Sequence, residues 1–341
     1  MRRVSIIVPC RNEKAHVEAF LASVLSQKLP VDTELEVLVA DGLSSDGTKE
    51  VLQQYAARHQ WIRVIENPER VASTALNRAI GRASGDIIIR MDVHAHYAQD
   101  YVEQCLAVML ETGADNVGGP AQTRAHGYRQ EAISAAFNSS FSCGGARFHN
   151  VGYEGPVDTV TFGCWRKEIF NRVGLFDEEL IRNQDDEFNL RLLRLGGQVF
   201  QSPRIRCWYE PRTSLRALFN QYFQFGYWKL RVIEKHGRPA SLRHLIPPIF
   251  VASTIFLILG SLFSKLAFLF LIATMGAYAT ASLGASIQVC RGKRKRLIPF
   301  MPFVFATYHI SYGCGFLLAL LNRVIRSGRS RLHVIQAASG R

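Results

Sequence analysis

The sequence lacks paired cysteines. Its seven cysteines are scattered along the chain, are odd in number and form no CxxC pair. This pattern excludes a disulfide framework and a cysteine-based zinc cluster, and it is typical of a protein that faces a reducing cytosol. The sequence also has no internal repeat and no low-complexity linker, so nothing in it indicates a repeat array.

Acidic residues are scarce relative to basic ones. The chain has 28 Asp and Glu against 41 Lys and Arg, which gives a formal charge of +13. Such an excess indicates a polyanionic partner. The densest basic stretches bracket the most apolar part of the chain, at residues 231–244, 291–296 and from 323 onward. We therefore expect that partner to be a membrane surface and not nucleic acid.

The first residues contain no long apolar run. The stretch MRRVSIIVPCRNE returns to charged residues too soon to form the core of a signal peptide. We therefore expect the N-terminal part of the chain to stay in the cytoplasm.

Apolar runs alternate with amphipathic stretches over the first hundred residues. Continuous apolar strands between helices predict an α/β fold with a mostly parallel sheet that is covered on both faces. The predicted strands are residues 4–10, 34–41, 62–68 and 86–92, and the predicted helices are residues 13–26, 46–58 and 72–83. Polar residues follow three of these strands, so we expect a ligand crevice at their carboxyl ends.

The next hundred residues are less regular. Residues 113–163 are rich in Gly, Asn, Ser and aromatics, and we interpret them as loops that line a cleft. Residues 164–180 and 184–197 predict two helices joined by a turn, and residues 198–211 predict a strand.

The last third of the chain is typical of a membrane region. Residues 214–236 carry aromatic and basic side chains at helical spacing, which predicts an amphipathic helix on the membrane surface. Residues 245–263, 266–290 and 297–321 are almost uncharged and long enough to cross the hydrocarbon core. Three spans would place the basic tail outside, against the positive-inside tendency. One segment is therefore a candidate for a re-entrant or interfacial position, either the third, which contains Pro and His, or the first, with Pro247-Pro248, and the sequence leaves two or three spans open.

These patterns predict four parts. A catalytic domain occupies residues 1–212, an interfacial helix residues 213–244, a membrane region with two or three transmembrane helices residues 245–325, and a basic tail residues 326–341.

A candidate metal site follows the fourth predicted strand. Asp92 and His94, two residues apart in RMDVHAHY, can reach one point if the backbone turns there. A carboxylate oxygen beside an imidazole suits Mn²⁺, with Mg²⁺ as the alternative.

Three separated motifs carry a resemblance to a known family. VSIIVPCRNE, VLVADGLSSDGT and GDIIIRMD occur in this order over the first ninety-two residues. The chain here resembles the family 2 glycosyltransferases, which are inverting nucleotide-sugar enzymes of the GT-A fold. This resemblance implies a Rossmann-like GT-A domain followed by an all-α membrane region. It also implies that five residues bind the nucleotide: Pro9, Arg11, Glu13, Asp41 and Asp92.

The same resemblance implies a general base. IRNQDDEFNLRLLRLGG resembles the family's Glu-Asp-x-Asp helix, in which an arginine follows the last acid by four residues. Alignment of that arginine with Arg191 implies that Asp185 is the general base, with Asp186 its rival by one position. The usual Asp-x-Asp metal motif has His94 in its last place here, which puts His94 in doubt as a direct ligand.

The remaining site residues come from two aromatic segments. Gly163 and Trp165 occupy the region that closes around donor and acceptor, where Gly163 would admit the sugar and Trp165 would stack on it or serve as core. Gln221 and Trp228 occupy the place of the Gln-x-x-Arg-Trp motif of processive synthases, but its arginine is missing, which argues against a processive synthase.

Within this family the chain resembles the membrane-bound enzymes of exopolysaccharide assembly. The resemblance implies a metal-dependent inverting hexosyltransferase of the cell membrane, with a cytoplasmic catalytic domain. It would move glucose from UDP-glucose onto a polyprenyl-diphosphate-linked oligosaccharide. A polysaccharide-assembly complex is a further candidate partner. Two alternatives stay open: a polyprenyl-phosphate sugar synthase, and a non-catalytic nucleotide-binding scaffold in the membrane.

Overall fold

The computed structural model describes residues 2–339, with side chains over residues 2–292 and 294–325. The chain divides into two compact units. Unit 1 comprises residues 1–125 and 145–211, and unit 2 comprises residues 126–144 and 212–341. The second unit is therefore built from two separate parts of the sequence.

Unit 1 is organised around an eight-stranded mixed sheet with the order β3-β2-β1-β4-β8-β6-β9-β7. The strands β3, β2, β1 and β4 are mutually parallel, and β8 runs antiparallel to both of its neighbours. The sheet consists of β1 (Arg2–Cys10), β2 (Thr33–Asp41), β3 (Ile62–Glu66), β4 (Ile87–Arg90), β6 (Asn116–Gly119), β7 (Gly155–Pro156), β8 (Thr161–Arg166) and β9 (Val199–Gln201). A separate antiparallel pair is formed by β5 (Ala95–Tyr97) and β10 (Cys207–Tyr209).

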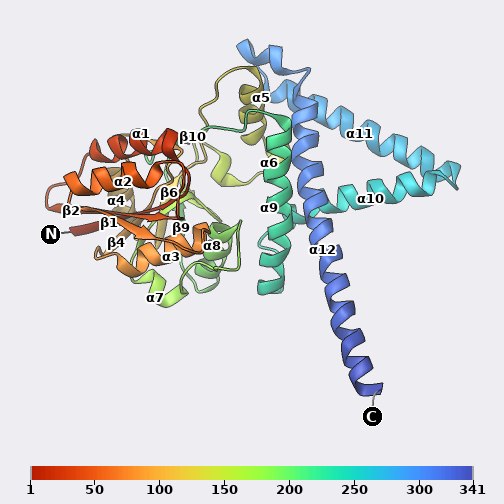
Figure 1. Ribbon diagram of the computed structural model, residues 1–341. Helices are drawn as coiled ribbons and strands as arrows, with labels where there is room; N and C mark the ends of the chain where they lie inside the picture. Colours follow the sequence, from red (N-terminus) through yellow and green to blue (C-terminus); the bar gives the residue numbers. More distant parts are fainter. Residues whose placement is uncertain (1, 340–341) are drawn as a thin grey trace. The chain divides into compact units, whose positions relative to one another are not determined.

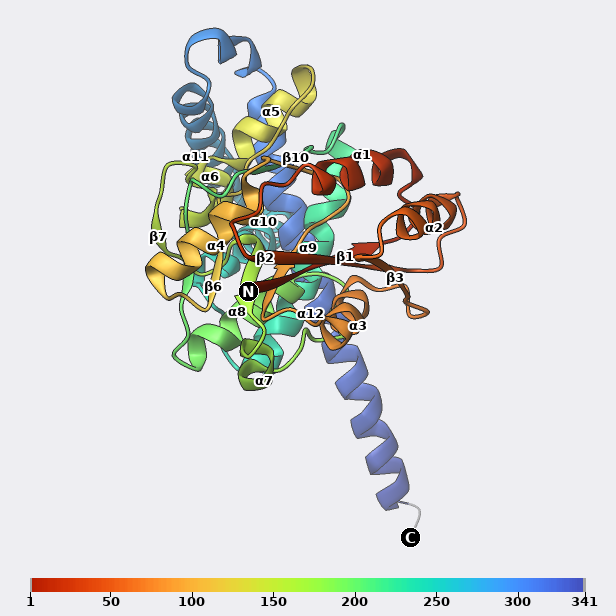
Figure 2. The same cartoon turned by 90° about the vertical axis from the view of Figure 1, so that its left-hand side faces the viewer.

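Helices cover both faces of this sheet, and Figures 1 and 2 show α1 and α2 on one face and α3 on the other. Alternate residues of β1 enter two separate cores: Val4, Ile6 and Val8 pack in the first and Ile7 in the second. The first core includes α1 (Lys14–Leu25), α2 (Thr48–Arg58) and α4 (Tyr101–Thr112), and the second includes α3 (Ala72–Arg82), α7 (Ile169–Val173) and α8 (Gln184–Arg194). Burial on both faces explains why the central strands are apolar throughout.

The predicted α/β class with a mostly parallel sheet is confirmed, with three local corrections. The strand predicted over residues 198–211 is two short strands, β9 and β10, which lie in different sheets. Residues 161–166 form the central strand β8, so the helix predicted from residue 164 starts only at Ile169. Residues 113–163 are not only loops, because they also hold β6, β7, α5 (Tyr128–Phe137), α6 (Ser140–Cys143) and the 3-10 helix η1 (Arg147–His149).

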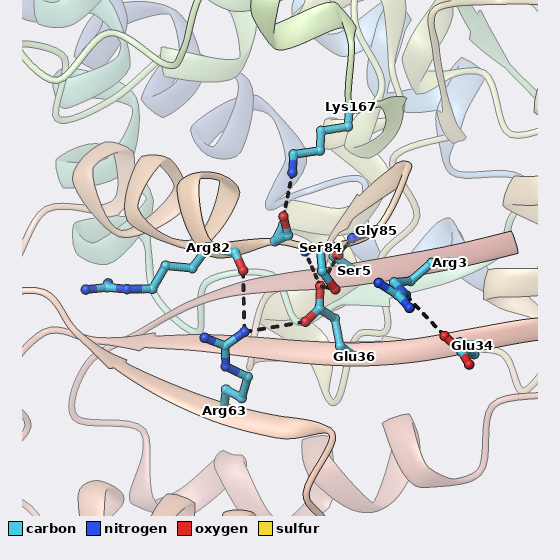
Figure 3. Close-up of polar contacts among 10 residues, drawn as sticks. Arg3, Ser5, Glu34, Glu36, Arg63, Arg82, Ser84, Gly85 and Lys167 are labelled. Carbon is cyan, nitrogen blue, oxygen red and sulfur yellow. Dashed lines mark hydrogen bonds and ion pairs between the residues drawn. The ribbon is translucent and has the colours of Figure 1, made fainter.

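The carboxylate of Glu36 joins β1, β2 and the segment before β4, near the end of the sheet where β1 begins (Figure 3). Glu36 of β2 accepts hydrogen bonds from Ser5 Oγ at 2.6 Å and from Ser84 N at 2.6 Å, and its side chain is 12% exposed. Ser5 Oγ in turn accepts from Gly85 N at 2.9 Å. Burial by itself would raise the pKa of Glu36, but the hydrogen bonds from Ser5 and Ser84 outweigh it, and the pKa lies below its ordinary value.

We expect Glu36→Gln to lower the free energy of unfolding by about 1–2 kcal/mol at pH 7, because a charged acceptor is lost. Because the folded-state pKa is depressed, this stabilisation is present above the unfolded-state pKa and is lost as pH falls through the folded-state pKa. Urea unfolding of the full chain in detergent should therefore separate the variant from wild type at pH 7 and bring them together at acid pH. Glu34→Gln is the matched control, since Glu34 makes only an exposed ion pair with Arg3. Equal shifts for both variants would contradict this account.

Unit 2 is entirely helical. Besides α5 and α6 it contains α9 (Leu215–His236), η2 (Leu242–Leu245), α10 (Ile246–Ser261), α11 (Lys265–Val289), η3 (Gly292–Leu297) and α12 (Met301–Ser339). The predicted helix at residues 214–236 corresponds to α9, and Ser214 caps it by accepting a hydrogen bond from Ala217 N. Among the described residues, three stretches are long and apolar enough to cross a membrane: Leu242–Ser261, Lys265–Val289 and Met301–Ile325. These stretches indicate membrane association.

Candidate active site

The loops that follow β1 and β2 are joined by hydrogen bonds at the carboxyl edge of the sheet. Asn12 N donates to Ser44 Oγ at 2.8 Å, and Ser45 N donates to Asn12 Oδ1 at 3.0 Å. Asp46 accepts from the backbone N–H of both Lys14 and Thr48, at 3.1 Å each. These hydrogen bonds therefore join the two loops into one wall at this edge of the sheet.

Asp41 lies at the base of this wall, at the end of β2. It is 1% exposed, and its carboxylate accepts hydrogen bonds from Ser44 N at 3.2 Å and from Ser44 Oγ. The side chain of Arg11 lies along Gly42, where a Cβ would come within 3.1 Å of it. Pro9, the second-to-last residue of β1, is partly buried. The structure thus gathers the predicted nucleotide residues of the first two strands at one edge.

Asp92 follows β4, next to β1, and is held by two neighbours. Tyr97 of β5, which is buried, accepts a hydrogen bond from Asp92 N at 2.7 Å. The guanidinium of Arg90 donates to both carboxylate oxygens of Asp92, at 3.0 Å each. Both contacts fix the carboxylate in one orientation.

Arg90 also donates through Nη1 to Asp185, in the first turn of α8. Its side chain is only 7% exposed, whereas those of Asp92 and Asp185 are 23% and 36% exposed. Asp92 and Asp185, which are 93 positions apart in the sequence, therefore meet on one buried guanidinium. Arg90, Asp92 and Asp185 therefore form one cluster of charged side chains joined by two ion pairs.

The surroundings of Asp185 favour a basic carboxylate. Burial raises the pKa of Asp185 above its ordinary value, Arg90 opposes this rise, and the facing carboxylate of Asp92 adds to it. A carboxylate that is both oriented and more basic than usual suits proton abstraction. The structure places Asp186 one residue further along α8.

His94 follows Asp92 by two residues, and its side chain is 64% exposed. Its Nδ1 is 3.1 Å from Glu13 Oε1, which is the arrangement that orients many metal-binding histidines. Within the described part of the chain, no group of three or more His, Cys, Asp and Glu side chains could hold a metal ion by itself. A carboxylate has about four lone-pair sites, so Asp92 retains acceptor capacity beyond the two hydrogen bonds from Arg90. The donor set fits a metal that takes its other ligands from substrate phosphates, and it does not fit an all-protein cage.

Gly163 and Trp165 serve packing in this structure. Trp165 is 2% exposed and its ring contacts Phe170, Phe176 and Phe188 in the second core. A Cβ on Gly163 would come within 2.4 Å of the Trp165 ring, and Gly163 also has a φ of +78°. This burial agrees with the alternative of Trp165 as core, and its contact with a sugar stays a prediction, while Gly163 is required by the backbone and by this ring.

Gln221 and Trp228 lie on α9 of unit 2. Gln221 Oε1 accepts a hydrogen bond from Arg212 Nε at 3.1 Å, and Trp228 is partly buried beside Tyr227. Both stay predictions as substrate contacts.

Strained backbone conformations are concentrated in the loops around the candidate site residues. Among the described residues, six that are not glycine have positive φ angles, and four of these lie in the site loops or next to site residues: Asn12, Leu43, Phe162 and Asn183. Such conformations cost about 1–3 kcal/mol each and persist only where surrounding contacts impose them. Their clustering indicates that the loops are pre-organised.

Arg90 and Tyr97 were not predicted as site residues. Arg90 ends the apolar run IIIR, where its charge stands out two residues before Asp92, but its second partner Asp185 is distant in the sequence. Tyr97 carried no signal, because its role depends on the pairing of β5 with β10.

The mixed sheet, with Asp41 at the end of β2 and Asp92 just after β4 in its parallel half, is the fold of a glycosyltransferase domain of the GT-A class. Residues 5–174 match the family described as Glycosyl transferase family 2. The chain is also 32% identical over 320 residues to the succinoglycan biosynthesis protein ExoA of Rhizobium meliloti, covering 93% of this chain and 94% of that protein. The chain belongs to glycosyltransferase family 2 and is of the ExoA type, as the motifs predicted.

Two further comparisons agree with this assignment. A Methanococcus voltae enzyme, dolichyl N-acetyl-alpha-D-glucosaminyl phosphate 3-beta-D-2,3-diacetamido-2,3-dideoxy-beta-D-glucuronosyltransferase, is 26% identical over 329 residues, covering 94% of this chain and 98% of its own. The solved structure of the mannosyltransferase PcManGT from Pyrobaculum calidifontis, in complex with GDP-Man and Mn²⁺, superposes with a TM-score of 0.62 at 19% identity. It covers 91% of this chain and 87% of its own, and shows the shared fold.

Proposed function

We propose that this protein is an inverting glycosyltransferase that moves glucose from UDP-glucose onto a polyprenyl-diphosphate-linked oligosaccharide in exopolysaccharide biosynthesis. The observation that carries the proposal is the joining of Asp92 and Asp185 by Arg90. One carboxylate belongs to the strand end where a donor diphosphate would bind, and the other to the helix that would supply the base. Their separation is fixed before any substrate arrives.

Asp185 is the proposed general base. It takes the proton from the acceptor hydroxyl as that oxygen forms its bond to the anomeric carbon, and the bond from this carbon to the UDP oxygen breaks on the opposite face. One displacement inverts the anomeric centre and releases UDP. Arg90 is a positioning residue in this scheme, because it orients Asp185 through Nη1 and fixes Asp92 from the same guanidinium.

Asp92 and His94 are the proposed holders of Mn²⁺ or Mg²⁺, and Glu13 orients the His94 ring. A divalent cation bound there would neutralise the charge that develops on the departing diphosphate. PcManGT, which shares the fold, was solved with Mn²⁺, and this supports a divalent metal here. Pro9, Arg11 and Asp41 form the proposed nucleoside subsite, because a buried carboxylate at Asp41 can accept from the uracil N–H.

The lipid-linked acceptor is proposed from two observations. Two relatives, whose matches cover 93% and 94% of this chain, are named for succinoglycan biosynthesis and for transfer to a dolichyl-linked sugar. The chain itself carries an apolar helical unit, which suits an acceptor embedded in a bilayer. Because basic residues flank the apolar helices, we propose a multi-pass protein of the cell membrane with its catalytic unit in the cytoplasm.

The proposal is tested by UDP release from detergent-purified protein. We expect release from UDP-glucose that depends on a polyprenyl-diphosphate oligosaccharide and on Mn²⁺ or Mg²⁺, and only background release from UDP-galactose, UDP-N-acetylglucosamine or GDP-mannose. Polyprenyl phosphate without a sugar is the control acceptor. Turnover with that acceptor alone would identify a polyprenyl-phosphate sugar synthase, and UDP binding without any turnover would identify a scaffold.

A further inference from the structure

The three apolar helices of unit 2 differ in how far other helices cover them. In the most apolar part of each candidate span, 44% of residues are buried for α12, against 11% for the segment containing α10 and 6% for α11. Figure 1 shows α12 beside α9, while α10 and α11 extend away from this pair as a hairpin. The three helices are similarly apolar, but α12 is largely covered by protein whereas α10 and α11 are largely uncovered.

The pairing of α9 with α12 is a close backbone contact. A Cβ on Gly226 of α9 would lie 2.0 Å from the carbonyl oxygen of Tyr312, and a Cβ on Gly315 of α12 would lie 2.0 Å from that of Phe223. Glycines at these places let the two helices approach more closely than any side chain would permit. The helices are thus fixed to each other near the middle of the third candidate span.

This contact places charged residues alongside the third candidate span. The two helices run in the same direction, because Tyr222 contacts Tyr308 and Glu234 pairs with Arg323 at 3.3 Å. Between these contacts α9 carries Lys229 and Arg231. If α12 crossed the bilayer, these charges would lie at membrane depth, where charged side chains are strongly disfavoured.

The first half of α12 packs on the polar segment 126–144. Tyr308 Oη donates to the Ile133 carbonyl oxygen at 3.2 Å, and His309 Nε2 lies 2.9 Å from that of Phe141. The α5 helix of this segment carries Glu131, which pairs with Arg296 at 2.7 Å. Charged groups thus accompany α12 at both ends of its apolar stretch.

We propose that α12 does not cross the bilayer. It lies with α9 at the membrane surface, and only the α10–α11 hairpin enters the lipid, with both of its ends on the same face. The inference depends on packing within unit 2 and not on the identity of the sugar.

The hairpin has the surface and the flanks of a lipid-inserted element. Its large apolar side chains are widely exposed: Phe256, Leu259, Leu262, Phe263, Leu266, Leu269, Phe270 and Ile272. At 25 residues α11 is about 37 Å long, enough for a hydrocarbon core of about 30 Å. Arg243 precedes the hairpin and Arg291 to Arg296 follow it, so both ends carry the basic residues that mark the cytoplasmic face.

Reporter fusions in bacterial cells test the sidedness. A phosphatase and a fluorescent protein are each joined after Gly237, before the hairpin, and in parallel to the C-terminus of the full chain. We expect both junctions to be fluorescent when they carry the fluorescent protein. When they carry the phosphatase, we expect its activity to be at least tenfold below that of a periplasmic control. Active phosphatase at the C-terminus would show an odd number of spans after Gly237 and overturn the proposal.

A matched pair of charge substitutions separates insertion from surface contact. We expect Ile272→Arg, in the first half of α11, to reduce the carbonate-resistant membrane fraction at least fivefold. Ile310→Arg, on the exposed side of α12, should leave that fraction within twofold of wild type, because an arginine at the interface reaches water. Equal losses would mean that α12 is lipid-inserted, and no loss from Ile272→Arg would mean that the hairpin is not.

Discussion

Asp185→Asn is expected to lower kcat by about 10³-fold while the donor KM stays within a few-fold, because proton removal by a positioned side chain contributes about 10²–10⁴. Asparagine keeps the size of the side chain and loses only the charge and the basicity. UDP release with a saturating acceptor measures the effect. Because the pKa of Asp185 is raised, the acid limb of the wild-type pH–rate profile should lie above the ordinary pKa of an aspartate.

Asp186→Asn is the matched control for this experiment. Asp186 lies one residue further along α8, about 100° around the helix, so it cannot take the place of Asp185 on Arg90. We expect its kcat to stay within a few-fold of wild type. The reverse pattern would move the base by one position, and full activity in both variants would remove the general base from the mechanism.

Arg90→Met is expected to reduce both activity and stability. Removing the guanidinium leaves Asp92 and Asp185 facing each other without a counter-charge, and loss of one member of a buried ion-pair cluster costs about 3 kcal/mol. We expect kcat/KM to fall by about 10²-fold, with a higher donor KM and a lower kcat, because both carboxylates lose their orientation. Kinetics and urea unfolding in detergent measure the two effects.

Two variants separate positioning from folding. Arg90→Lys keeps the charge but cannot donate to both carboxylates with the same fork, so we expect it to recover most of the stability and little of the activity. Arg78→Met removes an arginine whose pair with Glu69 is exposed, and it should change neither. If Arg90→Lys restores activity as fully as it restores stability, Arg90 serves the fold alone.

The sequence predicted most of the parallel half of the sheet and the acids that follow its strands. This succeeded because strands buried on both faces are continuously apolar, so Asp41 and Asp92 stand out where each run ends. Arg90 was missed because a single basic residue at the end of IIIR shows no partner until α8 brings Asp185 to it. The role of Trp165 stayed open between sugar contact and core, because an aromatic residue has the same sequence pattern in both places.

The membrane region shows the same limit. Residues 126–144 were interpreted as part of a loop region, because glycine and serine dominate their surroundings and α5 has little apolar periodicity. Its helical state depends on tertiary packing of Ala132, Ile133 and Ala136 against Phe305 and Tyr308. The sequence could not decide whether α12 faces lipid or protein, because both environments accept the same apolar side chains.

The discontinuous make-up of unit 2 bears on how the catalytic unit can be isolated. A truncation ending at Pro211 removes every membrane helix but retains residues 126–144, which belong to the other unit. The apolar side of α5 would then have lost Phe305 and Tyr308, and such uncovered patches promote aggregation. A soluble catalytic fragment therefore needs a second edit, in which a short polar linker replaces residues 126–144 between Ala125 and Gly145.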